Sequence, residues 1–252
     1  MDWPTHKDRL GCEIVRLLYE NKMILTWYRD KPSGWHLHSG KWSPFYIHLR
    51  ELSSHPEILR KIGYSLNLLI KEEMPDTDLI VGLAMAGIPI ATAISLEGNI
   101  PAAFTRKVEG GVADYQKTIE KYGKHSLVEG QLHKARKAVL LDDLVSYFTS
   151  KLEGLNLLEY EIRRRNLKDL DIPHVLVLLD REQGGYEEAK KHNVELHSLI
   201  PFKSKGIHWL KDVLDKIEYD TLKDYLKDPE RFQEYEIQNK LSQLCLSSTE
   251  SL

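Results

Sequence analysis

Two adjacent carboxylates at the end of an apolar run are the residues of this sequence best suited to chemistry. The run 138–141 leads directly into Asp142 and Asp143. A turn rich in hydroxyl groups follows and contains Ser146, Thr149 and Ser150. Carboxylates at a strand end accept hydrogen bonds from vicinal hydroxyls, while backbone N–H groups and the positive end of a helix dipole attract a phosphate. The segment therefore suits a sugar phosphate, and a solvated turn with helix caps is the alternative.

The sequence around this segment alternates short apolar runs with helical patterns. We expect strands at residues 79–82, 100–104, 138–141, 174–179 and 194–200 and helices at 88–96, 150–165 and 186–192. Strands that alternate with helices indicate an α/β fold with a mostly parallel sheet covered on both faces. In such sheets a ligand lies beyond the carboxyl ends of the strands, so the loops after Val81, Leu141 and Leu179 are the expected site.

The N-terminal part of the sequence shows a different pattern. Residues 8–22 have the apolar spacing of an amphipathic helix. Residues 26–50 are rich in aromatic residues, glycine and proline, which favours short strands and turns, with 45–49 as a strand. The next helix begins near Pro56, a residue that the first helical turn tolerates, and carries an apolar stripe over residues 58–70.

Two segments lie outside this alternation. Residues 106–130 are polar, contain glycines and have no sustained apolar periodicity. A segment of roughly 25 residues is too long for an inert connection, so we expect either a functional lid or a disordered insert. Residues 208–252 are charged and carry helical signals that Pro229 interrupts. We expect the last residues, 247–252, to be disordered.

The composition excludes several classes of protein. The chain has 252 residues, 42% of them hydrophobic, which is enough for a sizeable core. Its 35 basic and 38 acidic residues give a formal charge of -3, which argues against a non-specific nucleic-acid binder. Its two cysteines have no partners at metal-site spacing, and no stretch has the ~18 apolar residues of a membrane helix. We therefore expect a cytoplasmic protein with no nucleic-acid or membrane partner.

Four further segments, together with the Asp142-Asp143 segment, resemble motifs of the orotate phosphoribosyltransferase family. They are Ser39–Arg50, Val81–Ile90, Lys121–Gly130 and Leu179–Gly185. Each is modest by itself, but all come in the family's order, and the resemblance covers roughly residues 8–205. It implies a type I phosphoribosyltransferase-like fold, which is a mostly parallel twisted sheet flanked by helices, with an N-terminal hood of a helix and short strands.

The resemblance also implies a domain organisation. A phosphoribosyltransferase domain would span residues 1–207, with a base-binding hood at 1–55 and a mobile lid at 106–130. Residues 208–252 would form a charged helical extension.

Carried over residue by residue, the resemblance implies where substrates bind. Phe45 and Tyr46 would lie against the pyrimidine, and Arg181 would bind its carboxylate through parallel hydrogen bonds. Without the family, a core strand is the alternative for the aromatic pair and a surface ion pair for the arginine. The catalytic residues would be Lys107, Lys121, Asp142 and Asp143. The other substrate-binding residues would be His38, Lys41, Ala84, Ala86, Gly87, Arg106, Lys124, His125, Ser146, Thr149 and Ser150.

Two of these groups have structural alternatives of their own. Residues 84–87 would present backbone N–H groups to the pyrophosphate, or they would simply allow tight packing of a helix on the sheet. Arg106 and Lys107 would bind pyrophosphate, or they would form a solvated basic pair.

The implied reaction forms orotidine 5′-phosphate and pyrophosphate from orotate and phosphoribosyl pyrophosphate, a step in UMP synthesis. It would need Mg²⁺, held mainly by the substrate's pyrophosphate and water rather than by a protein metal site. A closing lid would exclude water from the activated sugar. The family further implies a homodimer whose lid residues are shared across subunits.

Three departures from the family fall on its phosphate-binding parts. Phe148 and Thr149 stand where glycine is expected, although a bulky residue makes a positive φ costly by about 1 kcal/mol or more. Glu120 occupies the place of the lid's main lysine, for which Lys117, Lys121 or Lys124 would have to substitute. The lid also contains about a dozen extra residues between Lys107 and Lys121, and His38 replaces a lysine that often precedes Ser39-Gly40. A non-catalytic relative that binds a pyrimidine or nucleotide, with a regulatory role, therefore stays open beside the enzyme. A phosphoribosyltransferase for another base is the third alternative.

Overall fold

The computed structural model describes residues 2–37, 40–107, 112–123 and 127–249. The chain divides into two compact units, of which the first comprises residues 1–11 and 52–201 and the second residues 12–51 and 202–252. Helix α1 (Trp3–Glu20) and the short helix η1 (Leu49–Ser54) contribute to both. The expected division at residue 207 stays a prediction.

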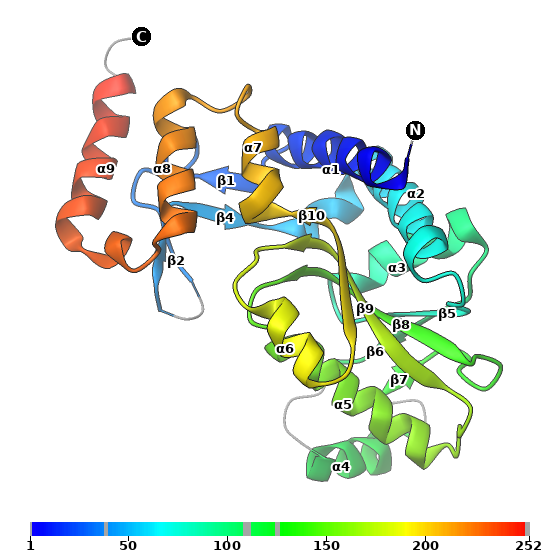
Figure 1. Ribbon diagram of the computed structural model, residues 1–252. Coiled ribbons are helices and arrows are strands. Elements are labelled where there is room, and N and C mark those ends of the chain that lie inside the picture. The colour runs from blue at the N-terminus through cyan, green and yellow to red at the C-terminus, as the bar shows by residue number, and fades with distance from the viewer. Residues whose placement is uncertain (1, 38–39, 108–111, 124–126, 250–252) are drawn as a thin grey trace. The chain divides into compact units, whose positions relative to one another are not determined.

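The first unit is built on a six-stranded sheet in the order β10-β9-β8-β5-β6-β7 (Figure 1). The strands from β10 to β6 run parallel, and β7 at one edge is antiparallel to β6. The strands are β5 (Leu79–Gly82), β6 (Ala102–Thr105), β7 (Val128–Glu129), β8 (Lys137–Val145), β9 (Asp171–Asp180) and β10 (Glu195–Pro201). The runs of buried aliphatic residues in β5, β8 and β9 are typical of strands covered on both faces. The predicted α/β class with a mostly parallel sheet is confirmed.

Helices cover both faces of this sheet (Figure 1). They are α2 (Pro56–Glu73), α3 (Gly87–Gly98), α5 (Thr149–Arg164) and α6 (Gly185–Lys191). On one face Leu155 and Leu158 of α5 pack with Leu140 of β8 in a single buried cluster. On the other face α2 and α3 lie so close together that a Cβ added to Gly63 would stand 2.8 Å from the Cβ of Ala93. The site therefore rests on a sheet clamped from both sides.

Among the boundaries that differ from the expected ones, two differ most. β8 does not stop at Leu141 but continues through the acid pair, because Asp142 and Val145 pair with Val177 and Asp180 of β9. The N-terminal helix begins at Trp3 rather than at residue 8. The acids consequently belong to a strand that is held on one side by β9, not to a free turn.

The expected lid segment contains structure that the sequence did not predict. Helix α4 (Val112–Tyr122) lies in it, and β7 adds a short strand to the sheet edge. Tyr115 is buried, and its ring meets that of Tyr160 on α5 edge to face, with 5.4 Å between the centroids. The prediction that the segment lacks apolar periodicity was wrong, because Val112, Tyr115 and Ile119 follow the spacing of one helical face. The described part of this segment is folded, so the disordered-insert alternative is wrong for it.

The second unit joins two distant parts of the chain around aromatic side chains. Two short antiparallel ribbons pair β1 (Ile24–Thr26) with β4 (Phe45–Ile47) and β2 (Trp35–His36) with β3 (Trp42–Ser43). The later elements are η2 (Phe202–Gly206), α7 (Ile207–Trp209), α8 (Lys216–Lys227), η3 (Arg231–Gln233) and α9 (Tyr235–Thr249). Phe45 packs against Phe202 and Tyr225, with ring centroids 5.4 and 5.7 Å away. The predicted short strands are confirmed, and the charged C-terminal part is helical as expected.

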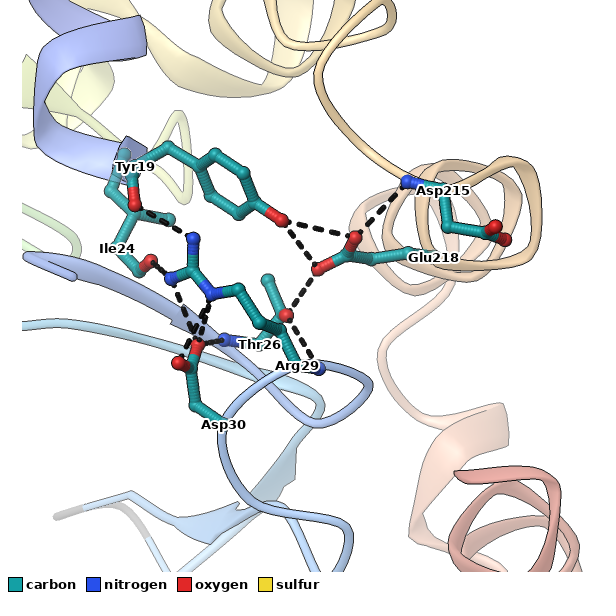
Figure 2. Close-up of polar contacts among 7 residues, drawn as sticks. All are labelled: Tyr19, Ile24, Thr26, Arg29, Asp30, Asp215 and Glu218. Carbon is teal, nitrogen blue, oxygen red and sulfur yellow. Dashed lines mark hydrogen bonds and ion pairs between the residues drawn. The ribbon is translucent and has the colours of Figure 1, made fainter. Parts of the chain in front are cut away.

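A buried polar cluster ties β1 to α8 in this unit (Figure 2). Glu218 is 2% exposed, and its carboxylate accepts hydrogen bonds from the hydroxyls of Tyr19, at 3.2 Å, and of Thr26. It also accepts one from the backbone N of Asp215 at 3.2 Å, which completes the capping box of α8. Burial raises the pKa of Glu218, and these hydrogen bonds oppose that rise. The cluster thus gives the buried carboxylate of Glu218 hydrogen-bond partners and holds β1, which pairs with the strand that carries Phe45.

The end of the chain corrects one further expectation. Residues 247–249 are helical as the last turn of α9, although we expected 247–252 to be disordered, and 250–252 lie outside the described residues. None of the helices in the described part of the chain is long and apolar enough to cross a membrane.

Candidate functional site

The strand order of the first unit marks where a ligand would bind. From β5 the chain passes to β6 on one side and then returns to β8 on the other side of β5. In open α/β sheets, ligands bind beyond the carboxyl ends of the strands at such a reversal. The register places Gly82 beside Leu141. The loop after β5 and the acid pair of β8 therefore meet at this position (Figure 1).

Asp142 and Asp143 lie at this reversal in different surroundings. Asp142 is buried, and its Oδ2 lies 2.7 Å from the Nζ of Lys151. Asp143 is partly exposed, and its Oδ1 accepts a hydrogen bond from the backbone N of Leu144 at 2.8 Å. Burial and then the neighbouring Asp142 raise the pKa of Asp143, while Lys151 opposes the rise. One acid is neutralised by a buried cation, and the other keeps exposed surface for a partner.

Lys151 is the residue of this site that sequence reasoning missed. It lies in the first turn of α5 with its side chain 5% exposed, and its Nζ also contacts the Oγ of Ser150 at 3.2 Å and the carbonyl oxygen of Leu144. The helix dipole disfavours a cation in the first turn of a helix. A lysine at that position was therefore itself a signal that an acidic side chain lies close by.

The turn between β8 and α5 keeps a left-handed backbone although it has no glycine. Phe148, the N-cap residue, has a φ of 70° and a ring that is 1% exposed in the core of the unit. This conformation costs about 1–2 kcal/mol, and burial of the ring offsets the cost. The backbone conformation for which the family uses glycine is therefore present. Thr149 and Ser150 are exposed beside it and Ser146 partly so, and the N-cap makes no side-chain hydrogen bond to α5, an arrangement that suits an anion.

The loop from β5 to α3, residues 83–86, contains two alanines, Ala84 and Ala86. Ala84 donates its backbone N–H to the Oγ1 of Thr105 at 3.0 Å, which holds the loop to β6. A Cβ added to Gly87 would lie 2.4 Å from the carbonyl oxygen of Leu141, so glycine is required for the packing of α3 on β8. The packing alternative therefore accounts for Gly87. Ala84 and Ala86 lie at the reversal of strand order, where small side chains leave the backbone approachable.

The basic pair after β6 lies at the same edge of the sheet. Arg106 donates its backbone N–H to Leu127 at 2.8 Å, and its Nη1 lies 3.5 Å from the Oε1 of Glu129. Lys107 is exposed. Because β5 and β6 are parallel neighbours, both residues follow a strand end next to the loop of Ala84.

The expected lid residues are only partly described. Lys121 lies on α4, with its Nζ 4.9 Å from the centroid of the Tyr122 ring, and a hydrogen bond with Tyr122 raises the pKa of Lys121. Lys124 and His125, like His38 in the hood, lie outside the described residues. Their roles stay predictions.

Arg181 follows the last residue of β9. Its backbone N donates to the carbonyl oxygen of Val145 at 3.0 Å, which places it beside the turn that follows the acid pair. The neighbouring Asp180 accepts a hydrogen bond from the backbone N of Glu182 at 2.7 Å, and burial raises the pKa of Asp180. The carboxyl end of β9 thus adds a guanidinium group and a further acid to the edge.

Three expected substrate-binding residues belong to the second unit. Phe45 is fully buried between aromatic rings, which favours the core-strand alternative for it. Tyr46 points the other way on the same strand, is 39% exposed and stacks on Trp35 with 18° between the ring planes. The Nζ of Lys41 pairs with the carboxylate of Glu230.

Most of the expected residues of the first unit share the carboxyl edge of the sheet. They are Ala84, Ala86, Gly87, Arg106, Lys107, Asp142, Asp143, Ser146, Thr149, Ser150 and Arg181. The edge combines exposed cations, small residues, hydroxyls and a carboxylate, which is the chemistry that a phosphorylated sugar would require.

Comparison with known proteins finds orotate phosphoribosyltransferases among the relatives of this chain. A scan against models of protein families finds no match to this chain. The orotate phosphoribosyltransferase of Methanosarcina mazei is 31% identical over 164 residues, which is 65% of this chain and 78% of the relative. The orotate phosphoribosyltransferase of Methanocaldococcus jannaschii is 31% identical over 168 residues, or 66% and 84% of the two chains.

Solved structures with the same fold support the assignment of the sheet. UMP synthase from Leishmania donovani superposes with a TM-score of 0.68 at 24% identity, over 86% of this chain and 42% of that longer chain. Orotate phosphoribosyltransferase from Aeropyrum pernix superposes with a TM-score of 0.59 at 22% identity, over 79% and 97% of the two chains. These likenesses show the fold of the chain.

Proposed function

Because this chain belongs to the orotate phosphoribosyltransferase family, we propose that it transfers a phosphoribosyl group from phosphoribosyl pyrophosphate to orotate. The products are orotidine 5′-phosphate and pyrophosphate, in the synthesis of UMP. The observation that carries this proposal is the acid pair Asp142-Asp143 at the reversal of strand order, in a chain of this family.

In this proposal one acid of the pair supplies the ribose contacts. Asp143 is partly exposed, and its carboxylate would accept hydrogen bonds from the vicinal ribose hydroxyls. Asp142 is held by Lys151 and supports the strand end rather than the sugar. As the orotate nitrogen bonds to the anomeric carbon, the bond from that carbon to pyrophosphate breaks and pyrophosphate leaves with the electron pair.

The start of α5 would receive the 5′-phosphate. The hydroxyls of Ser146, Thr149 and Ser150 surround a helix N-terminus whose dipole favours an anion. Phe148 motivated the non-catalytic alternative, yet its backbone adopts the left-handed conformation that glycine adopts most readily, which supports the proposal of a phosphate-binding turn. We therefore place turnover ahead of that alternative.

The base would be recognised by one ring and one guanidinium. Tyr46 offers an exposed ring for the pyrimidine, whereas Phe45 shapes the core beneath the strand. Arg181 would bind the carboxylate of orotate, which a base without a carboxylate does not offer.

Pyrophosphate would be bound by the basic pair and the loop from β5 to α3, together with Mg²⁺. Mg²⁺ is commonly held by one or two carboxylates plus substrate phosphates. The residues present fit this mode, since the carboxyl edge offers the partly exposed acid Asp143 and the described residues show no group of three ligating side chains there. Bound Mg²⁺ would supply positive charge against the charge that develops on pyrophosphate. Arg106, Lys107 and backbone N–H groups near Ala84 and Ala86 would orient the same group.

The assembly and location of the protein follow from the family resemblance. We propose a homodimer in which residues 106–130 act as the lid and are shared between subunits, with Lys121 as the lid cation that the structure describes. We also propose a cytoplasmic location, which agrees with the absence of a disulfide between Cys12 and Cys245.

The proposal is tested by following the absorbance of orotate after phosphoribosyl pyrophosphate and Mg²⁺ are added. We expect orotate to disappear with release of an equal amount of pyrophosphate. Asp169→Asn, a change of an exposed acid in the same unit, should leave the rate unchanged. No turnover, with calorimetry still showing binding of orotate or orotidine 5′-phosphate, would contradict the proposal and favour a non-catalytic binding protein.

A further inference from the structure

Two histidines and a glutamate gather near the amino ends of β9 and β10. The register pairs His174 of β9 with Glu195 of β10, and His197 lies two residues further along β10. Paired residues and residues two apart share one face of a sheet, so all three side chains lie on one face. Leu196 packs with the cluster of α5, so the three face the opposite side, where α2 ends at Glu73.

The three ligand atoms form a nearly regular triangle. The Nδ1 of His174 lies 3.2 Å from the Nε2 of His197, and the Oε2 of Glu195 lies 3.6 and 3.7 Å from these two atoms. Zn²⁺ bonds to histidine nitrogen and carboxylate oxygen at about 2.0–2.1 Å with tetrahedral geometry, which separates its ligand atoms by about 3.4 Å. One ion can therefore reach all three atoms without rearrangement of the backbone.

A second carboxylate orients one of these histidines. The Nδ1 of His197 lies 2.9 Å from the Oε2 of Glu73, whose other oxygen accepts hydrogen bonds from the Nζ of Lys7 and the Nε1 of Trp3, each at 2.8 Å. With the Nδ1 of His197 hydrogen-bonded to Glu73, the Nε2 of the same ring is directed at His174 and Glu195. Histidine ligands of metal ions commonly have such a carboxylate behind them.

The second histidine, His174, is partly buried, with its side chain 19% exposed, and its Nδ1 faces the Nε2 of His197 and the carboxylate of Glu195. The nearby cation Lys137 is engaged with Asp76 at 2.9 Å. The carboxylate of Glu195 is 66% exposed and leaves a path for an ion from solvent.

We propose that His174, His197 and Glu195 bind one divalent transition-metal ion of the zinc class, with Glu73 as the residue that positions His197 and water as the fourth ligand. The nitrogen-rich set disfavours Mg²⁺ and Ca²⁺, which prefer oxygen ligands. The site lies about 20 Å along β9 from its carboxyl end, so it is separate from the proposed substrate site. The ion would cross-link the edge strand β10 to β9 and, through Glu73, to the end of α2.

Zn²⁺ titration in competition with a chromophoric chelator tests this site. The full-length protein is first stripped of metal with a chelator and dialysed. We expect one Zn²⁺ per chain for the wild type, no competitive binding for His174→Ala, and affinity at least about 10-fold weaker for Glu195→Gln. Glu73→Gln should weaken binding by about 10–100-fold, as loss of a carboxylate behind a metal-bound histidine does. His133→Asn, a change of an exposed histidine in the same unit, serves as the matched control and should bind like the wild type.

Two further readouts separate metal binding from a structural role of the histidines. Co²⁺ in place of Zn²⁺ should give the absorption bands of a four-coordinate site in the wild type but not in Glu195→Gln. Because Glu195 is mostly exposed, that variant should unfold at the wild-type temperature without metal, whereas added Zn²⁺ should raise the unfolding temperature only of the wild type. Equal Zn²⁺ affinity in the wild type, His174→Ala and Glu195→Gln would overturn the proposal, as would the absence of stoichiometric binding by the wild type. Either result would mean that the two rings form only a hydrogen bond.

Discussion

The two ends of the same sheet hold their acidic side chains in opposite electrostatic settings. At the carboxyl end, burial and a neighbouring acid raise the pKa of Asp143, and the cation Lys151 is paired with Asp142. At the amino end, three donors converge on Glu73 and lower its pKa to about 2. The surroundings of Asp143 therefore disfavour its negative charge, whereas the hydrogen bonds to Glu73 stabilise its negative charge.

This difference indicates what each end is prepared to bind. An incompletely compensated carboxylate beside a helix N-terminus favours a ligand that brings hydroxyl donors and, through Mg²⁺, positive charge. A fully compensated carboxylate instead fixes the orientation of a histidine, which suits a metal ligand. We therefore predict that substitutions at the two ends of the sheet change the stability of the chain separately, with the largest loss expected first.

Lys151→Met should have the largest effect on stability. It leaves Asp142 buried without its cation, and breaking a buried pair in this way costs about 3–5 kcal/mol. Urea unfolding measures the loss, with Lys168→Met as an exposed control. Recovery of part of the loss in the double variant Asp142→Asn/Lys151→Met would support the explanation. A loss below about 1 kcal/mol would mean that the pair is not buried.

Phe148→Gly should cost about 2–4 kcal/mol. The stability lost when the buried ring is removed is larger than the stability gained when glycine replaces a residue with a left-handed backbone. Activity in folded protein should persist, because glycine keeps the same turn. Tyr147→Gly, a change of the exposed neighbour, is the control for backbone entropy. A stabilised Phe148→Gly protein would show that the ring contributes little to the core.

Glu73→Gln should cost about 1–2 kcal/mol at pH 6, since three hydrogen bonds to a partly exposed charge are weakened. The pKa of Glu73 is lower in the folded chain than its ordinary 4.5, so its contribution is complete above pH 4.5 and is lost as pH falls toward 2. The difference from wild type should shrink between pH 6 and pH 3 in denaturant unfolding. Glu72→Gln is the exposed control. A difference that does not change with pH would contradict this assignment.

Asp143→Asn should change stability with the opposite sign. Its pKa is raised above its ordinary 3.8, so ionisation destabilises the folded chain as pH rises past that value. The variant should therefore gain stability relative to wild type between pH 4 and pH 7, measured by thermal unfolding. A variant that loses stability over this interval would show that the carboxylate is well compensated.

The sequence predicted those features that depend on local periodicity. The strands and the helices around Leu140 and Leu158 were expected because aliphatic runs and helical stripes are visible without knowledge of contacts. Helix α4 was missed because its apolar face is short and lies between glycines in a polar segment, and its order depends on the tertiary contact of Tyr115 with Tyr160.

The parts of the sites that arise from pairing between distant residues were not predictable in the same way. The metal-ligand triangle depends on the register of β9 against β10, since His174 and His197 are brought together by strand pairing and not by sequence spacing. The burial of Phe45 likewise depends on Phe202 and Tyr225, which lie far along the chain. The pairing of Lys151 was predictable, because a lysine in the first turn of a helix indicates that an acidic side chain lies close by.

Calorimetric titration of phosphoribosyl pyrophosphate with Mg²⁺ into wild type, Asp143→Asn and Glu195→Gln tests most directly whether the carboxyl end alone is the phosphoribosyl site. We predict that Asp143→Asn weakens the binding of phosphoribosyl pyrophosphate by about 10–100-fold, because hydrogen bonds to a charged acceptor contribute about that much. The affinity for orotate should be unchanged. Glu195→Gln, at the amino end, should bind like the wild type. Equal weakening of phosphoribosyl pyrophosphate and orotate by Asp143→Asn, or wild-type binding of phosphoribosyl pyrophosphate by that variant, would contradict the assignment.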